Sequence, residues 1–199
     1  MATTAYWAPN QASVAQKRTY TFTVPNSVGN TYRATTNGKT VAYSSVSGDT
    51  AALAATGLFN LLNVATGIAA EFTEITWTNP SDGVVVAEAK VPGTPFAGVP
   101  GTDKGLVMDT GNGLAGGITT ANTVDNASPS DVNDSANWLR NSVRALPQNG
   151  DDMVITNSAV SLLWNLGSLS AVLLNSYTLW MDFTGQVGLP FQNGAGYPE

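Results

Sequence analysis

The sequence predicts a mainly β protein, in which an α+β sandwich-like module with one helix on an antiparallel sheet precedes a short β-solenoid or β-sandwich. Residues 18–24 alternate aromatic residues and valine with polar residues, as a half-buried strand does. Residues 51–64 are rich in Ala and Leu at near-helical spacing. Asn157, Asn175 and Asn193 recur at an interval of 18. These observations divide the chain into an N-terminal arm over 1–17, an α+β structural module over 18–100, a connector over 101–136 and a C-terminal assembly domain over 137–199.

Composition removes many classes of chemistry. The chain has 199 residues, of which 43% are hydrophobic, so it can build a core and is not globally disordered. It has no Cys and no His, which excludes disulfides, Cys/His zinc sites and thiol or imidazole catalysis. Only 11% of its residues are charged, and its eight Lys and Arg are scattered, giving a net charge of -6. A nucleic-acid partner is therefore not expected. The sequence also predicts no transmembrane helix and no signal peptide.

The elements of the 18–100 module follow from local signals. The arm before it carries Tyr6 and Trp7 as isolated aromatics, so we expect it to order only against a partner or the next domain. The Asn37-Gly38 pair predicts a tight turn between two strands, and Ser47 to Thr50 provide capping oxygens for the helix. The strands are expected over 18–24, 31–36, 40–45, 72–78 and 84–90. The connector is expected to be extended, with Leu106, Val107 and Met108 as its buried contact.

The C-terminal asparagines have similar surroundings. VITNS around Asn157 aligns with VLLNS around Asn175, and more loosely with PFQNG around Asn193. Such a repeat favours a β-solenoid with stacked asparagines, a structural ladder of Asn157, Asn175 and Asn193. Evenly spaced strands of an antiparallel sandwich are the alternative. Beyond Asp152 the charged residues are only Asp182 and Glu199, so this region either buries most of its faces or meets other subunits.

Three groups of side chains could carry chemistry. Residues 131–135 (DVNDS) alternate oxygen ligands as a calcium loop does, but lack the glycine and glutamate of an EF-hand, which favours Asx turns. Asp151 and Asp152 could be the acids of a glycosidase, but adjacent residues on a strand point to opposite faces. The aromatic residues of the C-terminal half suit a core, an interface or a sugar-stacking platform: Trp138, Trp164, Tyr177, Trp180 and Phe183. We predict no catalytic residues, no metal site and no cofactor.

Several segments resemble known structural proteins. TYTFTV, NGKTVAYSS, SGDTAA, FTEITWT and PGTPFAG are similar to a small module of structural proteins from tailed bacteriophages and prophages. DVNDSANWLRNSVRALPQNGDDMVI resembles the entry segment of bacterial and phage β-helix proteins, and VSLLWNLGSLSAVLLNS with FTGQVGLP resembles the coil that follows it. The entry segment usually has glycines before its proline. This chain has residues 140–144 (RNSVR) there, so its first turn is expected to be built differently.

The resemblance implies a non-enzymatic virion structural protein located in the virion, most simply a capsid decoration or cement protein that assembles as a symmetric oligomer. The expected partners are further copies, preferably as a trimer, and other virion proteins such as the major capsid protein. A tail, baseplate or fibre component is the alternative, as is a carbohydrate-binding adhesin that stacks glycans on Trp164, Tyr177 and Trp180. An enzyme using Asp151, Asp152 or Asp182 is a further alternative. The expected interface residues are Trp164, Asn175, Tyr177, Trp180, Phe183, Leu189 and Phe191.

Overall fold

The protein is mainly β and divides into two compact units. The computed structural model describes residues 2–23, 29–36, 38–64, 67–94, 96, 106–111, 117–162, 169 and 171–188. Unit 1 comprises Met1–Val14, Pro100–Thr102 and Ala127–Glu199, and unit 2 comprises Ala15–Val99 and Asp103–Asn126. The boundaries therefore differ from those expected, because the start of the chain belongs with its end.

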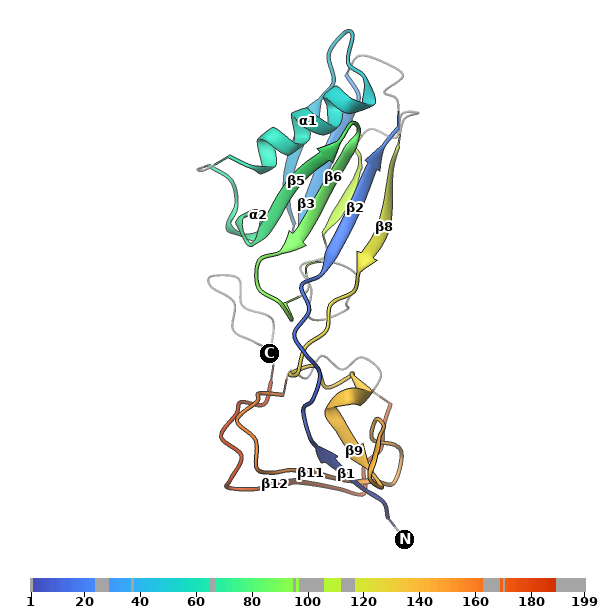
Figure 1. The fold of residues 1–199 in the computed structure, drawn as a ribbon, viewed down its shortest axis with the longest axis vertical. Helices are drawn as coiled ribbons and strands as arrows, with labels where there is room; N and C mark the ends of the chain where they lie inside the picture. The colour runs from blue at the N-terminus through green and yellow to red at the C-terminus, as the bar shows by residue number, and fades with distance from the viewer. Residues whose placement is uncertain are drawn as a thin grey trace. The chain divides into compact units, whose positions relative to one another are not determined.

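The described residues of unit 2 form two antiparallel sheets and two helices (Figure 1). The four-stranded sheet has the order β5-β6-β2-β8, with strands Ile75–Ser81, Val84–Ala89, Lys17–Phe22 and Ile118–Val124. The three-stranded sheet has the order β4-β3-β7, with strands Lys39–Ser44, Thr31–Thr36 and Val107–Thr110. The helices are α1, Ala51–Leu62, and the short α2, Ala70–Thr73.

The core of unit 2 lies between the sheets and α1. Thr50 caps this helix, with its side chain accepting a hydrogen bond from the amide of Leu53. The helix buries Leu58 and Leu62 against aromatic residues of the strands, of which Tyr20 and Tyr32 are almost completely buried. Alternate residues of β2, β3 and β6 point into this core, which is the period-two pattern that the sequence predicts.

Two strands of unit 2 lie in the expected connector. β7 pairs with β3 and β8 pairs with β2, each antiparallel. The buried connector residues Leu106 and Met108 agree with expectation, whereas Val107 is exposed. Gly38 has the positive φ that the predicted turn requires, and Asn37 lies outside the described residues. Strand β5 begins three residues later than expected, because Phe72 belongs to α2.

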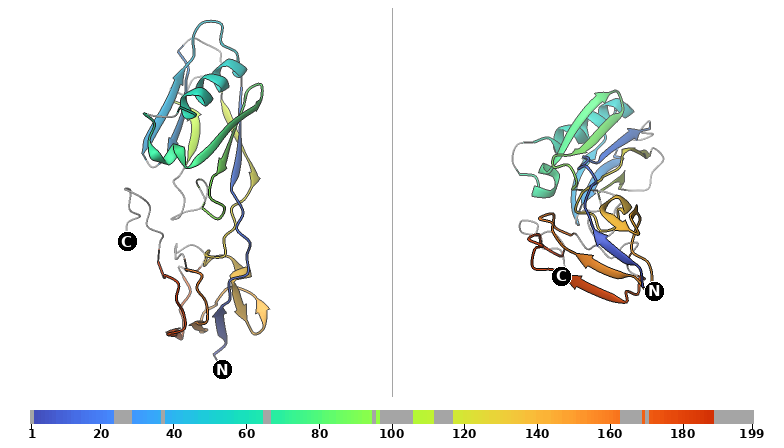
Figure 2. Two further views of the ribbon diagram at one scale, coloured as in Figure 1. Left: turned by 60° about the vertical axis from the view of Figure 1, so that its left-hand side comes forward. Right: turned by 60° about the horizontal axis from the view of Figure 1, so that its bottom comes forward.

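Unit 1 contains a five-stranded sheet of the order β10-β9-β1-β11-β12. Its strands are Val143–Arg144, Trp138–Arg140, Thr4–Trp7, Asp152–Ile155 and Ser176–Leu179. β1 therefore lies at the centre, antiparallel to β9 and parallel to β11. Figure 2 shows β11 and β12 stacked beside β1. The first residues of the chain are thus the central strand of a sheet built from its last third, whereas the sequence predicts an arm that orders against a partner or the next domain.

The predicted asparagine ladder is wrong in its interval. β11 pairs with β12 in parallel register, with Asp152 opposite Ser176 and Ile155 opposite Leu179, so equivalent positions are 24 residues apart rather than 18. Asn157 lies in a bend after β11 with a φ of 46°, whereas Asn175 precedes β12 and bonds Asp152. Asn157 and Asn175 therefore do not stand opposite each other. The 24-residue spacing of β11 and β12, and not the local likeness of the sequence, sets which residues pair. Asn193 lies outside the described residues.

The turn between β9 and β10 differs from a glycine-containing one. Arg140 pairs with Val143 across a two-residue loop. Asn141 and Ser142 have φ values of 50° and 64°, so both central residues are left-handed, as in a type I′ hairpin turn. Residues 140–143 therefore close the hairpin without the glycine that such a turn favours.

Candidate assembly surface

Strand β12 is the outermost strand on one side of the described sheet of unit 1, and its inward face is open; we call each of the parallel strands β1, β11 and β12 a rung of the stack. Tyr177 and Leu179 stand opposite Met153 and Ile155 in the parallel register, and so point to the same side of the sheet. Met153 is 1% exposed and Ile155 0%, whereas Tyr177 is 46% and Leu179 51% exposed. Within the described part of the chain, no strand pairs with the outer edge of β12. The core of the stack therefore reaches the surface here.

Further exposed apolar side chains lie close to β12 in sequence. Leu173 precedes β12 and is exposed, and Trp180 and Met181 follow it directly and are also exposed. We call these five residues, Leu173, Tyr177, Leu179, Trp180 and Met181, the stack end. Large contiguous apolar patches are uncommon on monomeric soluble proteins and mark interaction sites.

Polar contacts with the preceding rung hold the stack end in place. The Asp152 carboxylate accepts hydrogen bonds from Asn175 Nδ2 at 2.7 Å and from Ser176 Oγ at 2.5 Å. These bonds, that from Ser176 first, lower the pKa of Asp152. The Trp180 amide donates to the Ile155 carbonyl at 3.0 Å. The rung is therefore fixed by its neighbour before any partner binds.

The carboxylate of Asp182, which follows the stack end in sequence, is also satisfied within the chain. Asp182 accepts a hydrogen bond from Thr156 Oγ1 at 2.9 Å. The backbone N–H of Asn157, followed by this hydroxyl, lowers the pKa of Asp182. The Asp182 charge is thus satisfied by Thr156 and Asn157, which follow β11, and the stack end itself remains apolar.

The structure brings two of the predicted interface residues, Tyr177 and Trp180, to the stack end. Asn175 is engaged with Asp152, and Phe183 packs against the core of unit 1, so both support the rung from within. Trp164, Leu189 and Phe191 lie outside the described residues. Sequence reasoning missed Leu173, Leu179 and Met181, because Leu179 is recognised as a core-side residue only from the 24-residue register.

The acidic candidates have structural contacts. Asp151 is 2% exposed and forms a bidentate pair with Arg140, with Oδ2 2.6 Å from Nε and Oδ1 3.1 Å from Nη2. This pair, with the Gln148 amide, lowers the pKa of Asp151 against the opposing effect of burial. Asp131 Oδ1 accepts from the Asn133 amide at 2.8 Å, which is the Asx turn that the sequence favours over a calcium loop. Among the described residues, no cluster of three potential metal ligands is present.

Asn137 explains why the DVNDSANW segment is shaped as it is. Its Nδ2 donates to the carbonyls of Ser128 and Asp131, and its Oδ1 accepts from the amides of Asn10 and Gln11 at 3.1 Å. A completely buried amide thus has both of its ends satisfied. The tryptophan that follows it, Trp138, is also fully buried and belongs to the core rather than to a surface platform.

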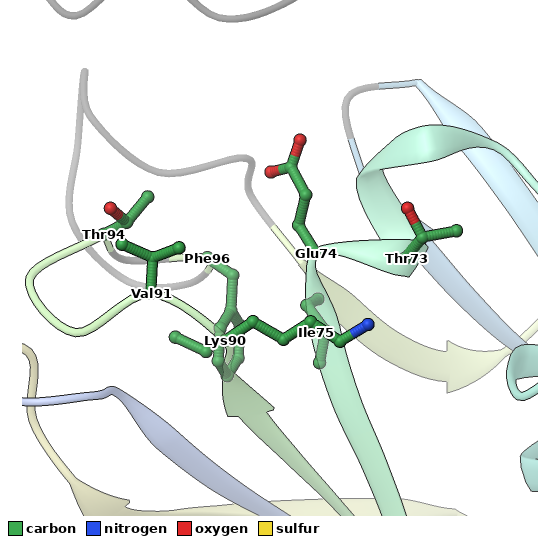
Figure 3. Close-up of a pocket in the computed structure, with 8 residues that line it drawn as sticks. Thr73, Glu74, Ile75, Lys90, Val91, Thr94 and Phe96 are labelled. Carbon is green, nitrogen blue, oxygen red and sulfur yellow. The ribbon is translucent and has the colours of Figure 1, made fainter.

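Unit 2 has a separate apolar pocket of about 220 Å³ (Figure 3). Ile75 and Phe96 form part of its lining, with Glu74 and Lys90 among the polar residues beside them. The pocket can accept a small apolar group.

Comparisons with known proteins identify no family for this chain. The chain matches none of the protein-family models, and the search of curated proteins also finds no match. No helix in the described part of the chain is both long and apolar enough to cross a membrane.

Proposed function

We propose that this protein is a non-enzymatic virion structural protein, a capsid decoration or cement protein that forms a symmetric oligomer through the stack end. The observation that carries this proposal is the exposure of Tyr177 and Leu179, which face the same way as the buried Met153 and Ile155. A stack whose core is open at its last rung is completed when another protein surface covers it.

Energetics supports association at this surface. Fully burying one large apolar side chain is worth about 1.5–3 kcal/mol, and the half-exposed Tyr177 and Leu179 gain part of that when they are covered. Covering the stack end therefore offsets part of the entropy lost on association. Proteins commonly protect exposed strand edges with lysines or other charges. β12 (SYTL) has no charged residue, so nothing on the strand itself opposes the addition of another subunit.

The virion assignment rests on the sequence resemblance together with the arrangement of unit 1. We interpret the parallel rungs β1, β11 and β12 as a short β-solenoid, as in the phage β-helix proteins that residues 131–155 resemble. Unit 2, with a helix on antiparallel sheets, suits the small phage module that the first 100 residues resemble. A tail or baseplate position uses the same surface with different neighbours.

The test compares the full chain with a variant that charges the stack end. Light scattering of the full chain is expected to give a trimer or another closed oligomer, and Leu179→Glu is expected to give a monomer with an unchanged circular dichroism spectrum. Val143→Glu, at an exposed residue of β10 in the same unit, is the matched control and should leave the oligomer intact. A full chain that remains a monomer, or a Leu179→Glu variant that still assembles, would contradict assembly through this surface.

A second experiment tests the virion assignment. In particles purified after co-expression with the major capsid protein of the same virus, the protein is expected in a fixed ratio to that capsid protein. Leu179→Glu should reduce this ratio, and Val143→Glu should not. Absence of the wild-type chain from such particles would count against a decoration protein.

Glycan binding is a second candidate, favoured by the exposure of both Tyr177 and Trp180. Aromatic faces of this kind can stack on sugar rings. A glycan array would support an adhesin if binding occurred and was lost in Trp180→Ala while the oligomer persisted. An array without binding would exclude this use for the glycans tested.

A further inference from the structure

The N-terminal segment, residues 2–14, fills a slot formed by the other end of the chain. Strand β1 pairs with β9 on one side and with β11 on the other. Its inward side chains, Ala5 and Trp7, are 0% and 2% exposed. The Trp7 and Trp138 rings meet edge to face with centroids 5.0 Å apart. The slot therefore recognises this segment by backbone pairing and by two buried side chains.

Contacts beyond the strand continue along the segment. The Asp152 amide donates to the Thr3 carbonyl at 2.8 Å, and the Ala8 amide donates to the Asn137 carbonyl at 2.9 Å. Further on, Val14 forms an isolated bridge with Ala127. The partners in these bonds lie more than 100 residues away in sequence. They form one continuous acceptor surface over residues 127–160.

The segment can leave this slot without disturbing the sheets of unit 2. Strand pairing in the described part of unit 2 begins at Lys17, after the segment ends. Residues 2–14 contain no charged side chain, so withdrawal and insertion move no charge across the interface. Pro9 removes a backbone donor just after β1 and favours extended backbone at Ala8.

We propose that the slot is also an intersubunit site, in which the N-terminal segment of a second copy of this chain replaces the chain's own segment in the oligomer. This inference rests on the proposed function, because it needs an oligomer. Exchange of an identical element preserves every contact within the slot, so it costs little and links subunits by contacts as extensive as those of a core. Each subunit then donates residues 2–14 and receives the same residues from a neighbour.

The absence of cysteine makes a direct test available. Tyr6 and Leu139 are opposite each other in the antiparallel pair β1/β9, and both line one surface hollow. Directly opposed residues have Cα atoms about 4.5–5.5 Å apart, within the range that a disulfide spans. The variant Tyr6→Cys/Leu139→Cys is therefore expected to oxidise in the folded protein. A disulfide within one chain leaves the denatured protein at the monomer mass, and exchanged segments link different chains.

The experiment oxidises this variant as the assembled oligomer and separates it on a denaturing gel without reductant. Exchange predicts that most chains migrate at multiples of the chain mass and return to the monomer position after reduction. Mixed oligomers of tagged Tyr6→Cys chains and untagged Leu139→Cys chains should give a linked heterodimer. Tyr6→Cys/Val46→Cys, with its second cysteine at an exposed site of unit 2, is the control for random collisions and should link few chains.

The outcomes separate this inference from the proposed function. An oligomer by light scattering that cross-links only within chains overturns segment exchange and leaves the proposed function standing. A monomer that cross-links only within its own chain overturns both. Equal linking in the Val46 control also overturns exchange, because the slot would then show no preference for the segment.

Discussion

The two units differ in how their strands pair and in how completely their cores are covered. Unit 2 builds its core from two antiparallel sheets and a helix, and its strand pairs β3-β4 and β5-β6 are local hairpins. Unit 1 pairs β1, β11 and β12 in parallel, so these three strands pair with residues at least 24 positions away, and its central strand comes from the start of the chain. Unit 2 thus combines local hairpins with long-range pairs such as β2-β8, whereas unit 1 joins the start of the chain to its last third and leaves the inward face of β12 exposed.

The largest expected difference between the units comes from Trp7→Ala. Removing this ring leaves a cavity beside Trp138, and large-to-small changes of this kind cost about 3–5 kcal/mol. We expect unit 1 to unfold at lower temperature while the unit 2 transition stays in place, so that calorimetry resolves two steps.

Tyr6→Ala is the matched control for this change, because Tyr6 is the neighbouring residue of the same strand and is exposed. It should shift the unit 1 transition much less than Trp7→Ala does. One cooperative transition that moves as a whole in Trp7→Ala would show that the stability of the two units is coupled and that they do not unfold separately.

Glycine packing gives the next largest expected effect. A Cβ at Gly185 would lie 2.9 Å from the backbone carbonyl of Val160, whereas one at Gly57 would lie 2.4 Å from the Tyr43 ring. Overpacking costs about 1–3 kcal/mol. We expect the larger loss of stability for Gly185→Ala, because the Val160 backbone can move less than the Tyr43 side chain. Gly57→Ala also regains about 1 kcal/mol of helix propensity.

Chemical denaturation of both variants measures this difference. Gly117→Ala is the control, because the nearest atom to its Cβ is a side-chain oxygen at 3.8 Å and an alanine fits there. A Gly57→Ala variant less stable than Gly185→Ala would mean that the hydrogen bond of Tyr43 to Asp49 holds the ring as firmly as a backbone.

The same contrast explains which elements could be predicted from sequence. The strand Thr31–Thr36 and the helix from Ala51 carry their own periodicity, capping residue and turns, so local patterns suffice. β1 has only four residues, and β8 (ITTANTV) is mostly polar, so both exist because of distant partners that no local pattern reveals. At the stack end, the sequence predicts Tyr177 and Trp180 as interface residues. Leu173 and Leu179 resemble ordinary core residues until the register is known.

Acid is expected to weaken unit 1 through its carboxylates. The bond from Arg140, and then the Gln148 amide, hold the pKa of Asp151 below its ordinary value, and hydrogen bonds likewise lower the pKa of Asp152 and Asp182. The folded pKa of each carboxylate lies below the unfolded value of about 3.9. The stability that the three carboxylates contribute to unit 1 is therefore fully present above that pH. It is lost as the pH falls through the lowered pKa.

Urea unfolding at pH values from about 5 down to 2.5 should therefore show a falling midpoint for unit 1. In Asp151→Asn the midpoint is expected to be lower already at neutral pH, because Arg140 loses its charged partner, and to fall less steeply with acid. A midpoint for unit 1 that rises as the pH is lowered would contradict this assignment of the carboxylates.

The smallest expected effect is a gain in unit 1 from Ser142→Gly. Ser142 has a φ of 64° in the β9-β10 turn, a conformation that costs a side-chain-bearing residue about 1–2 kcal/mol and that glycine adopts freely. The greater freedom of glycine in the unfolded chain offsets part of this relief, so we expect unit 1 to gain at most about 1 kcal/mol in its free energy of unfolding. Asn141→Gly, at the neighbouring φ of 50°, should gain less, because asparagine tolerates this region better than serine. Denaturant unfolding checks both, and a loss of stability in Ser142→Gly would mean that the serine side chain contributes more to this turn than its backbone strain costs.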